Sequence, residues 1–350
     1  MTPGAPEPLA REELRAAVRA FGLKGPVRFE SIGRGASRTV KGRLTAGGAR
    51  FMLKRRPVEA MPVEHAAFLH RFQAFLRAHG VPAPALARTV DGAPEHRTEL
   101  VAIELAEWVD GARWTRTEGE AASAGAVVGR MITAAARFDP GPAPPGISFH
   151  RAGTFAGVGG PVLESAMRAD PGGDASSLRA AIERLGSLGH EAWERAESTR
   201  FADEGPRPGC VHGDLHPGNA IFADGTVQAV IDFDSVRIDY RACELSAALL
   251  HFANHPMPGE DPVAWREDLD LVRLHAFAES CMAALGAPLS AAELAAIPWL
   301  MIEACALETL VPVARTGRFA QVRADRAIPF LVRKCEWIAR HVPQALSSRS

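Results

Sequence analysis

Short apolar runs separated by glycine turns dominate the first third of the chain. A strand is expected near residues 39–44, the turn Ala46-Gly47-Gly48 follows, and the apolar run of residues 51–53 ends at Lys54. A further run covers residues 100–105. Apolar runs of this length, bounded by turn residues, are typical of β-strands, and two runs joined by a glycine turn form a hairpin. The pattern therefore predicts strands in this part of the chain.

Helical spacing dominates the remainder. In residues 63–79 the side chains of Phe68, Phe72 and Phe75 recur on one face of a helix. Ala-rich segments predict further helices at residues 118–138 and 177–198, whereas residues 139–146 and 151–175 are expected to be loops. Three or four helices are expected between residue 232 and about residue 341. The C-terminal two thirds should be mainly helical.

Composition limits the function classes. The chain has 350 residues, 47% of them hydrophobic, which suits two lobes with sizeable cores. The formal charge of -1 gives no basic footprint for nucleic acid or an anionic membrane. No apolar run approaches the roughly 20 residues of a membrane helix, and the N-terminus lacks the apolar core of a signal peptide. We expect a soluble, cytoplasmic protein; its oligomeric state stays open.

The cysteines indicate a reducing compartment. They are odd in number and widely spaced, and none forms a Cys-x-x-Cys pair, so free buried thiols explain them better than disulfides or zinc. They are Cys210, Cys243, Cys281, Cys305 and Cys335.

The strongest chemical signal begins at Cys210, where the chain reads Cys-Val-His-Gly-Asp-Leu-His-Pro-Gly-Asn. Asp214 precedes Asn219 by five residues, and Asp232 follows the hairpin signal Asp224-Gly225. Each piece alone fits an ordinary turn. Phosphoryl transfer needs a carboxylate that orients and deprotonates the attacking hydroxyl, and oxygen ligands for Mg²⁺. Asp214 fits the first role, and Asn219 with Asp232 fits the second.

Together these motifs resemble those of the aminoglycoside phosphotransferase and choline kinase superfamily, which includes the type II homoserine kinases. The resemblance implies an α+β, bilobal protein-kinase-like fold with ATP as co-substrate. The N-lobe, an antiparallel sheet plus one helix, would cover residues 1–109, and a mainly helical C-lobe residues 110–350. Protein kinases carry Arg where Gly213 stands, so His-Gly-Asp favours the small-molecule branch.

The same resemblance indicates where ATP phosphates would bind. Gly33, Gly35 and Ser37 lie in a Gly-x-Gly segment, whose backbone can approach phosphate oxygens closely. Alone, this segment fits a plain hairpin as well. Lys54, at a strand end after three apolar residues, is the candidate for the α/β-phosphate contact. With Arg55 and Arg56 beside it, a solvated basic face is the alternative.

The resemblance also suggests an ion-pair partner for that lysine and a hinge for adenine. Glu64, in the first turn of the 63–79 helix, is the candidate partner of Lys54; Glu59 is the alternative, and either acid could simply favour the helix dipole. Glu107, Trp108 and Val109 follow the 100–105 strand and would form the hinge. Trp108 fits a core aromatic equally well.

Three further positions bear on the catalytic loop. Glu244 stands where the family commonly has the aspartate that holds this loop, and its extra methylene leaves the support of the loop open to rearrangement. His212 matches the family's structural histidine, and His216 begins the turn that presents Asn219. A histidine–metal site is the less favoured interpretation, because hard Mg²⁺ prefers oxygen ligands.

The acceptor stays open at this level. Only residues 235–242 separate the metal-binding strand from the next helix, which argues against a protein substrate. Candidates are aminoglycoside or nucleoside antibiotics, as in antibiotic resistance, amino alcohols, homoserine and sugars. A pseudokinase that binds nucleotide and regulates a partner is the non-enzymatic alternative. Acids that would suit an amine-bearing acceptor are Asp234, Asp239, Glu303 and Glu308.

Overall fold

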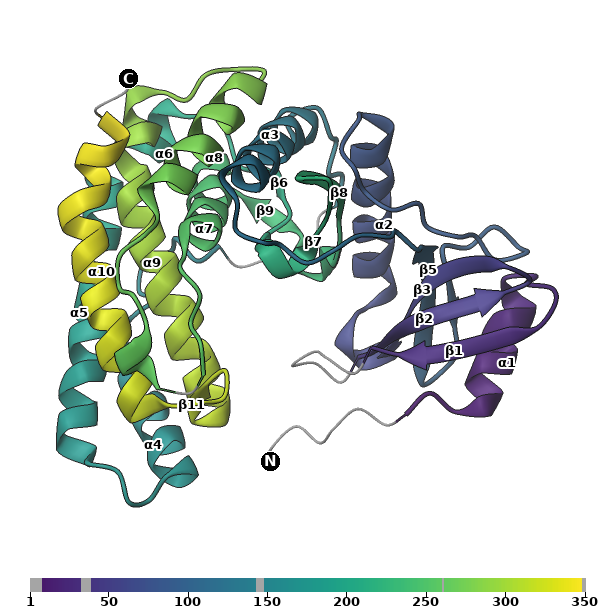
Figure 1. Ribbon diagram of the computed structural model, residues 1–350, viewed down its shortest axis with the longest axis horizontal. Coiled ribbons are helices and arrows are strands. Elements are labelled where there is room, and N and C mark those ends of the chain that lie inside the picture. Colours follow the sequence, from purple (N-terminus) through teal and green to yellow (C-terminus); the bar gives the residue numbers. More distant parts are fainter. Residues whose placement is uncertain (1–7, 33–38, 143–147, 260, 348–350) are drawn as a thin grey trace.

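The computed structural model describes residues 8–32, 39–142, 148–259 and 261–347. Its N-terminal part contains an antiparallel sheet with strand order β1-β2-β3-β5-β4 (Figure 1). The strands are β1 (Val27–Ser31), β2 (Val40–Ala46), β3 (Ala49–Pro57), β4 (Glu95–Arg97) and β5 (Val101–Glu107). The expected strands are thus confirmed as β2, β3 and β5. Gly47 and Gly48 join β2 to β3 with φ of 55° and 89°, a conformation that glycine adopts without strain.

Alternation along the strands gives this sheet two unlike faces. On one face, Leu53 and Ile103 pack against α1 (Arg11–Ala20), a helix that the sequence pattern did not indicate. On the other face, the β2–β3–β5 register aligns Lys41, Lys54 and Glu104 in one row. The charged row faces the cavity between the two parts of the molecule.

Helix α2 (Val63–Ala78) confirms the predicted helix and stands between the sheet and the C-terminal part (Figure 1). Phe68, Phe72 and Leu76 are buried in the same hydrophobic cluster as the C-terminal helices, and the ring of Phe72 lies 5.1 Å from that of Phe138. The sheet and α1 share a separate, smaller cluster. The buried face of α2 therefore packs with the C-terminal helices and not with the sheet. A lobe boundary at residue 109 stays a prediction.

The C-terminal part is mainly helical, as expected. Its helices are α3 (Glu118–Ala135), α4 (Gly159–Ala169), α5 (Ala175–Ser198), α6 (Phe201–Glu204), α7 (Arg241–Ala253), α8 (Leu271–Ala284), α9 (Ala291–Thr316) and α10 (Ala324–Ser347). The expectation of loops at residues 151–175 was wrong for α4, whose start Gly159-Gly160-Pro161 consists of turn-type residues while Val162 and Ala166 are buried.

Helix α9 corrects the expectation that no segment is long and apolar enough for a membrane span. By length and hydropathy it qualifies, but 67% of its most apolar window is buried inside the protein. It packs against α5, α7 and α10, so it is a core helix of this lobe. The five cysteines are buried and free, as predicted.

Two short two-stranded antiparallel sheets carry the chemistry-bearing loops. β6 (Gly209–Val211) pairs with β9 (Arg237–Asp239), and β7 (Ala220–Ala223) pairs with β8 (Thr226–Val230). The turn between β7 and β8 is the predicted Asp224-Gly225, with φ of 49° and 73°. The loop from β6 to β7 bears Asp214 and Asn219, and the loop from β8 to β9 bears Asp232.

Candidate active site

The loop between β6 and β7 is built around the buried imidazole of His212. Its Nε2 donates to the carbonyl of Ile231 at 3.1 Å, and its Nδ1 accepts from the N–H of Asp214 at 3.4 Å. Burial lowers the pKa of His212 to about 4, so the ring is neutral at physiological pH. The ring ties the two functional loops together, which agrees with the structural role that the sequence predicts.

Gly213 is fixed by a side chain on each of its two peptide groups. A carboxylate oxygen of Glu244 accepts its N–H at 2.9 Å, and Nη1 of Arg237 donates to its carbonyl at 2.8 Å. Its φ is 79°, and a Cβ there would overlap Arg237 and the carbonyl of Ser235. Glutamate at position 244 therefore reaches the loop and supports it; burial raises the pKa of Glu244 to about 7.

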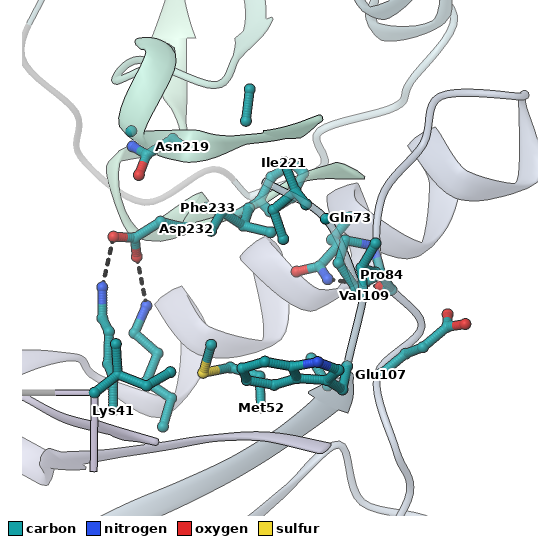
Figure 2. A pocket seen from close by; sticks show the side chains of 18 of the residues that line it. Lys41, Met52, Gln73, Pro84, Glu107, Val109, Asn219, Ile221, Asp232 and Phe233 are labelled. Atoms are coloured by element: carbon teal, nitrogen blue, oxygen red, sulfur yellow. Dashed lines mark hydrogen bonds and ion pairs between the residues drawn. The ribbon is translucent and has the colours of Figure 1, made fainter. Parts of the chain in front are cut away.

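Asp214 and Asn219 are held together by the loop itself. Nδ2 of Asn219 donates to the carbonyl of Asp214 at 2.8 Å and to its carboxylate at 3.2 Å. The amide nitrogen is thus committed, and the amide oxygen lies toward Asp232 (Figure 2). Burial raises the pKa of the Asp214 carboxyl, which makes it a stronger base than an exposed aspartate.

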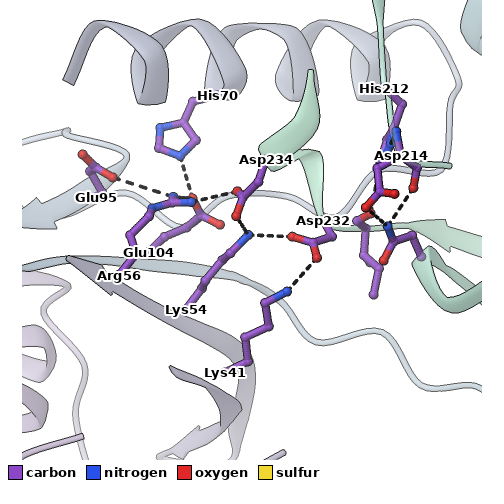
Figure 3. Close-up of polar contacts among 12 residues, drawn as sticks. Lys41, Lys54, Arg56, His70, Glu95, Glu104, His212, Asp214, Asp232 and Asp234 are labelled. Carbon is purple, nitrogen blue, oxygen red and sulfur yellow. Dashed lines mark hydrogen bonds and ion pairs between the residues drawn. The ribbon is translucent and has the colours of Figure 1, made fainter. Parts of the chain in front are cut away.

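Asp232 receives one lysine on each carboxylate oxygen (Figure 3). Lys54 Nζ lies 2.7 Å from Oδ1, and Lys41 Nζ lies 2.6 Å from Oδ2. Burial opposes ionisation, but the two ammonium groups hold the pKa of Asp232 well below its usual range. Asp232 has a φ of 66°, uncommon for a residue with a side chain and often found at functional sites. The sequence reasoning missed Lys41, because a lysine in a strand usually faces solvent.

The predicted partners of Lys54 need correction. Among the described residues Lys54 makes no ion pair with Glu64, which is exposed in the first turn of α2, and Glu59 is exposed in the preceding turn. Its second carboxylate is Asp234, 2.6 Å from Nζ. A third acid, Glu104, is the cross-strand neighbour of Lys54 on β5. The sheet therefore supplies an acid where one from the helix was predicted.

Arg56 belongs to the same ion-pair network as Lys54. It is buried, so it does not form the solvated basic face that was the alternative. Its side chain is 2% exposed, and its guanidinium binds both Asp234, at 2.8 Å, and Glu104. His70 of α2 contacts Glu104 at 2.7 Å, so α2 contributes an imidazole where an acid was expected. Arg56 and Glu104 therefore link β3, β5, α2 and the Asp232 loop (Figure 3).

A cavity of about 850 Å³ lies between the sheet and the catalytic loops (Figure 2). Its charged and amide side chains are Lys41, Lys54, Glu104, Asn219, Asp232 and Asp234. Glu107, Trp108 and Val109 line it too, at the end of β5. The N–H groups of Glu107 and Trp108 donate to the carbonyls of Ala85 and Arg50. Trp108 is half-buried and belongs to neither hydrophobic cluster, so it is not a core aromatic. Gly33, Gly35 and Ser37 lie outside the described residues.

A second group of polar side chains lies near the carboxylate of Asp214. His216 Nε2 is 3.9 Å from its carboxylate, and the ring of His216 lies 5.7 Å from that of His251 on α7. Nε2 of His251 lies 3.0 Å from Glu308 on α9. Burial disfavours its charge, but Glu308 raises the pKa of His251. Of the acids that the sequence offered for an acceptor, Glu308 is therefore the one near Asp214.

The other three acids have structural partners. Glu303 is fully buried, and His150 Nδ1 lies 2.9 Å from its carboxylate. Asp239 is 2% exposed and accepts from Arg237 at 3.0 Å. Asp234 is bound by Lys54 and Arg56 as described above.

Comparisons with known proteins agree with this geometry. The model of the phosphotransferase enzyme family matches residues 28–285. The fold is similar to that of amicoumacin kinase hAmiN in complex with AMP-PNP, Ca²⁺ and Ami, with a TM-score of 0.65 and 15% identity over 95% of this chain and 93% of that one. The microcompartment-associated aminopropanol kinase has a TM-score of 0.65 and 17% identity over 96% of this chain and 98% of that one.

An aminoglycoside phosphotransferase from Alicyclobacillus acidocaldarius subsp. acidocaldarius gives a TM-score of 0.63 and 15% identity over 95% of this chain and 96% of that one. Among curated protein sequences no match is found. At these identities the solved structures establish the fold, and the predicted protein-kinase-like architecture is confirmed. Since the family model covers most of the chain and contains the loops of Asp214 and Asp232, this protein belongs to the phosphotransferase enzyme family.

Proposed function

We propose that this protein transfers the γ-phosphoryl group of ATP to a hydroxyl of a small molecule. The observation that carries the proposal is the convergence of Lys54, Asp214, Asn219 and Asp232, which come from different elements. Lys54, Asn219 and Asp232 line the cavity between the sheet and the catalytic loops. The carboxylate of Asp214 adjoins it through the hydrogen bond that it accepts from Asn219. Family membership supports the reaction class; the nucleotide and the acceptor are our inference.

In this reaction the acceptor oxygen attacks the γ-phosphorus, the bond from that phosphorus to the β,γ-bridging oxygen breaks, and ADP leaves. Asp214 orients the hydroxyl and takes its proton. Its raised pKa favours this role. The donor set suits Mg²⁺, because the amide oxygen of Asn219 and the carboxylate of Asp232 are hard oxygen ligands. Bound there, Mg²⁺ would neutralise charge on the β- and γ-phosphates.

The nucleotide would lie along the charged row of the sheet, with its phosphates at Lys54 and its base at the end of β5. Glu107 and Trp108 already donate their N–H groups within the protein. Val109 is then the hinge residue whose N–H would serve the adenine edge. The half-buried indole of Trp108 supplies an apolar surface beside it.

The acceptor would lie on the far side of Asp214, near Glu308 and His251. An exposed carboxylate there suits an amine-bearing alcohol, and the aminopropanol kinase shares this fold. A cytoplasmic enzyme of this kind would act on metabolites or antibiotics. The pseudokinase alternative gains no support, because a pure binding module has no need for a positioned base at Asp214.

The test is ADP release with Mg·ATP against a panel of hydroxylated amines, sugars and antibiotics. We expect turnover that needs both Mg²⁺ and one class of acceptor, and loss of that turnover in Asp232→Ala. Generic protein substrates should give only background labelling. Robust phosphorylation of a protein, or equal activity of the Asp232→Ala enzyme, would refute the proposal.

A further inference from the structure

Lys41 is a cation of the cavity to which the proposed chemistry assigns no role. It lies at the start of β2, directly opposite Lys54 in the β2–β3 register, and both side chains face the cavity. Like charges directly opposite each other destabilise a sheet. Asp232 relieves this repulsion, since its two carboxylate oxygens each accept from one of the lysines, at 2.6 and 2.7 Å. The pair of lysines therefore needs an anion between them.

The two lysines differ in what they keep when Asp232 is engaged elsewhere. Lys54 has a second carboxylate, Asp234, at 2.6 Å, and its side chain is 8% exposed. Lys41 is 24% exposed, and Asp232 is the carboxylate that binds it among the described residues. A divalent cation bound by Asp232 would compete with both ammonium groups for its carboxylate oxygens and would repel them. The geometry marks Lys41 as the one that is released.

We propose that Lys41 is a second phosphate-binding residue, which neutralises Asp232 in the nucleotide-free protein and binds the terminal phosphates of ATP in the complex. Mg²⁺ held by Asp232 would neutralise charge on the terminal phosphates, so a cation beside Asp232 would be near the same charge. The flexible stem of lysine lets its ammonium group move between two anions a few ångströms apart. This inference rests on the proposed function and assigns a further residue to it.

The experiment compares Lys41→Met with the wild-type protein by calorimetric titration of ATP, ADP and AMP, each with Mg²⁺. Methionine keeps the length and apolar stem of lysine and removes the charge. Lys24→Met, at an exposed site in the same part of the chain, is the matched control. A charge-assisted contact implies that Lys41→Met weakens ATP binding about ten- to a hundredfold, ADP binding less, and AMP binding hardly at all. Lys41→Arg should restore part of the ATP affinity.

An unchanged or higher affinity of Lys41→Met for Mg·ATP would overturn the inference. If Lys41 only neutralises Asp232, its removal takes away a competitor of the metal, and Mg·ATP should bind equally or more tightly in Lys41→Met. Equal losses for ATP, ADP and AMP would also refute a contact with the terminal phosphates. Absence of Mg·ATP binding by the wild-type protein would refute the proposed function, and this inference with it. Thermal melting of each variant separates loss of binding from loss of the fold.

Discussion

Gly213 offers a sharp test of how the catalytic loop is held, through the substitution Gly213→Ala. The residue has a φ of 79°, and an added methyl group would overlap the guanidinium of Arg237 and the carbonyl of Ser235. The left-handed backbone costs about 1–2 kcal/mol for alanine. Displacing Arg237 also removes its bond to the Gly213 carbonyl, a further loss of about 1.5–3 kcal/mol for a charged donor.

Gly225→Ala provides the control for the backbone term. Gly225 has a φ of 73° in the turn between β7 and β8, but a methyl group there meets nothing within 4 Å. Gly225→Ala should therefore show only the cost of placing alanine in the left-handed backbone conformation. We expect Gly213→Ala to lower the free energy of unfolding by about 1.5–3 kcal/mol more than Gly225→Ala. At roughly 2 °C per kcal/mol, its melting temperature should fall about 3–6 °C further.

The same substitution should affect turnover, because it lies next to the proposed base. A displacement of Asp214 by about 1 Å would lower turnover on the order of 10²-fold, whereas Gly225→Ala should retain activity. Urea unfolding and steady-state kinetics on both variants give the two quantities. Arg237→Ala should not rescue Gly213→Ala, since the Ser235 carbonyl still fills the space. Equal stability losses in the two glycine variants would show that Arg237 yields easily, and would refute this reasoning.

Three other predictions follow from the site. Asp214→Asn should lower turnover about 10²–10⁴-fold with nearly unchanged ATP affinity, checked by kinetics beside calorimetry; near-normal turnover would assign the rate to substrate positioning. Lys54→Ala should raise the Michaelis constant for ATP, lower turnover or both, and Lys54→Arg should not fully rescue, because a planar fork replaces a point charge; unchanged kinetics would exclude its phosphate role. Glu244, with a pKa of about 7 in the folded state against 4.5, binds its proton more tightly when folded, so its contribution to stability is complete below pH 4.5 and is lost as pH rises through 7. As pH rises from 5 to 8, the free energy of unfolding of Glu244→Gln should therefore increase by up to about 3 kcal/mol relative to that of the wild type. The same pH dependence of the melting temperature in both proteins would contradict the assignment.

The residues of the catalytic loop could be predicted from the sequence, because they lie in one short motif whose spacing places them on the same loop. Asp214 and Asn219 were identified from the spacing of their motif, and Lys54 from its place in the pattern that the family resemblance implies. All three line or adjoin the cavity. The partner of Lys54 could not be predicted in the same way. A carboxylate near a lysine can come from any element that packs against it, and here Glu104 comes from β5 and Asp234 from a loop.

The acids of α9 show the same limit. Glu303 and Glu308 both follow the apolar pattern of one helix, and nothing in the sequence separates their surroundings. In the folded protein one is fully buried against His150, and the other is exposed near His251. Helix α4 escaped detection for a different reason, since its glycine and proline start is typical of turns.

The separate hydrophobic clusters determine which part of the molecule can open by itself. Leu44, Leu53 and Ile103 pack with α1 in the small cluster, whereas α2 shares its core with the large helical part. A unit with few buried contacts has a low free energy of local opening. If the proposed nucleotide enters this cavity, we expect the sheet and α1 to move as one unit while α2 stays with the helical part. Hydrogen exchange should reflect this: amide protons of β2 and β3 exchange sooner than those in the middle of α2.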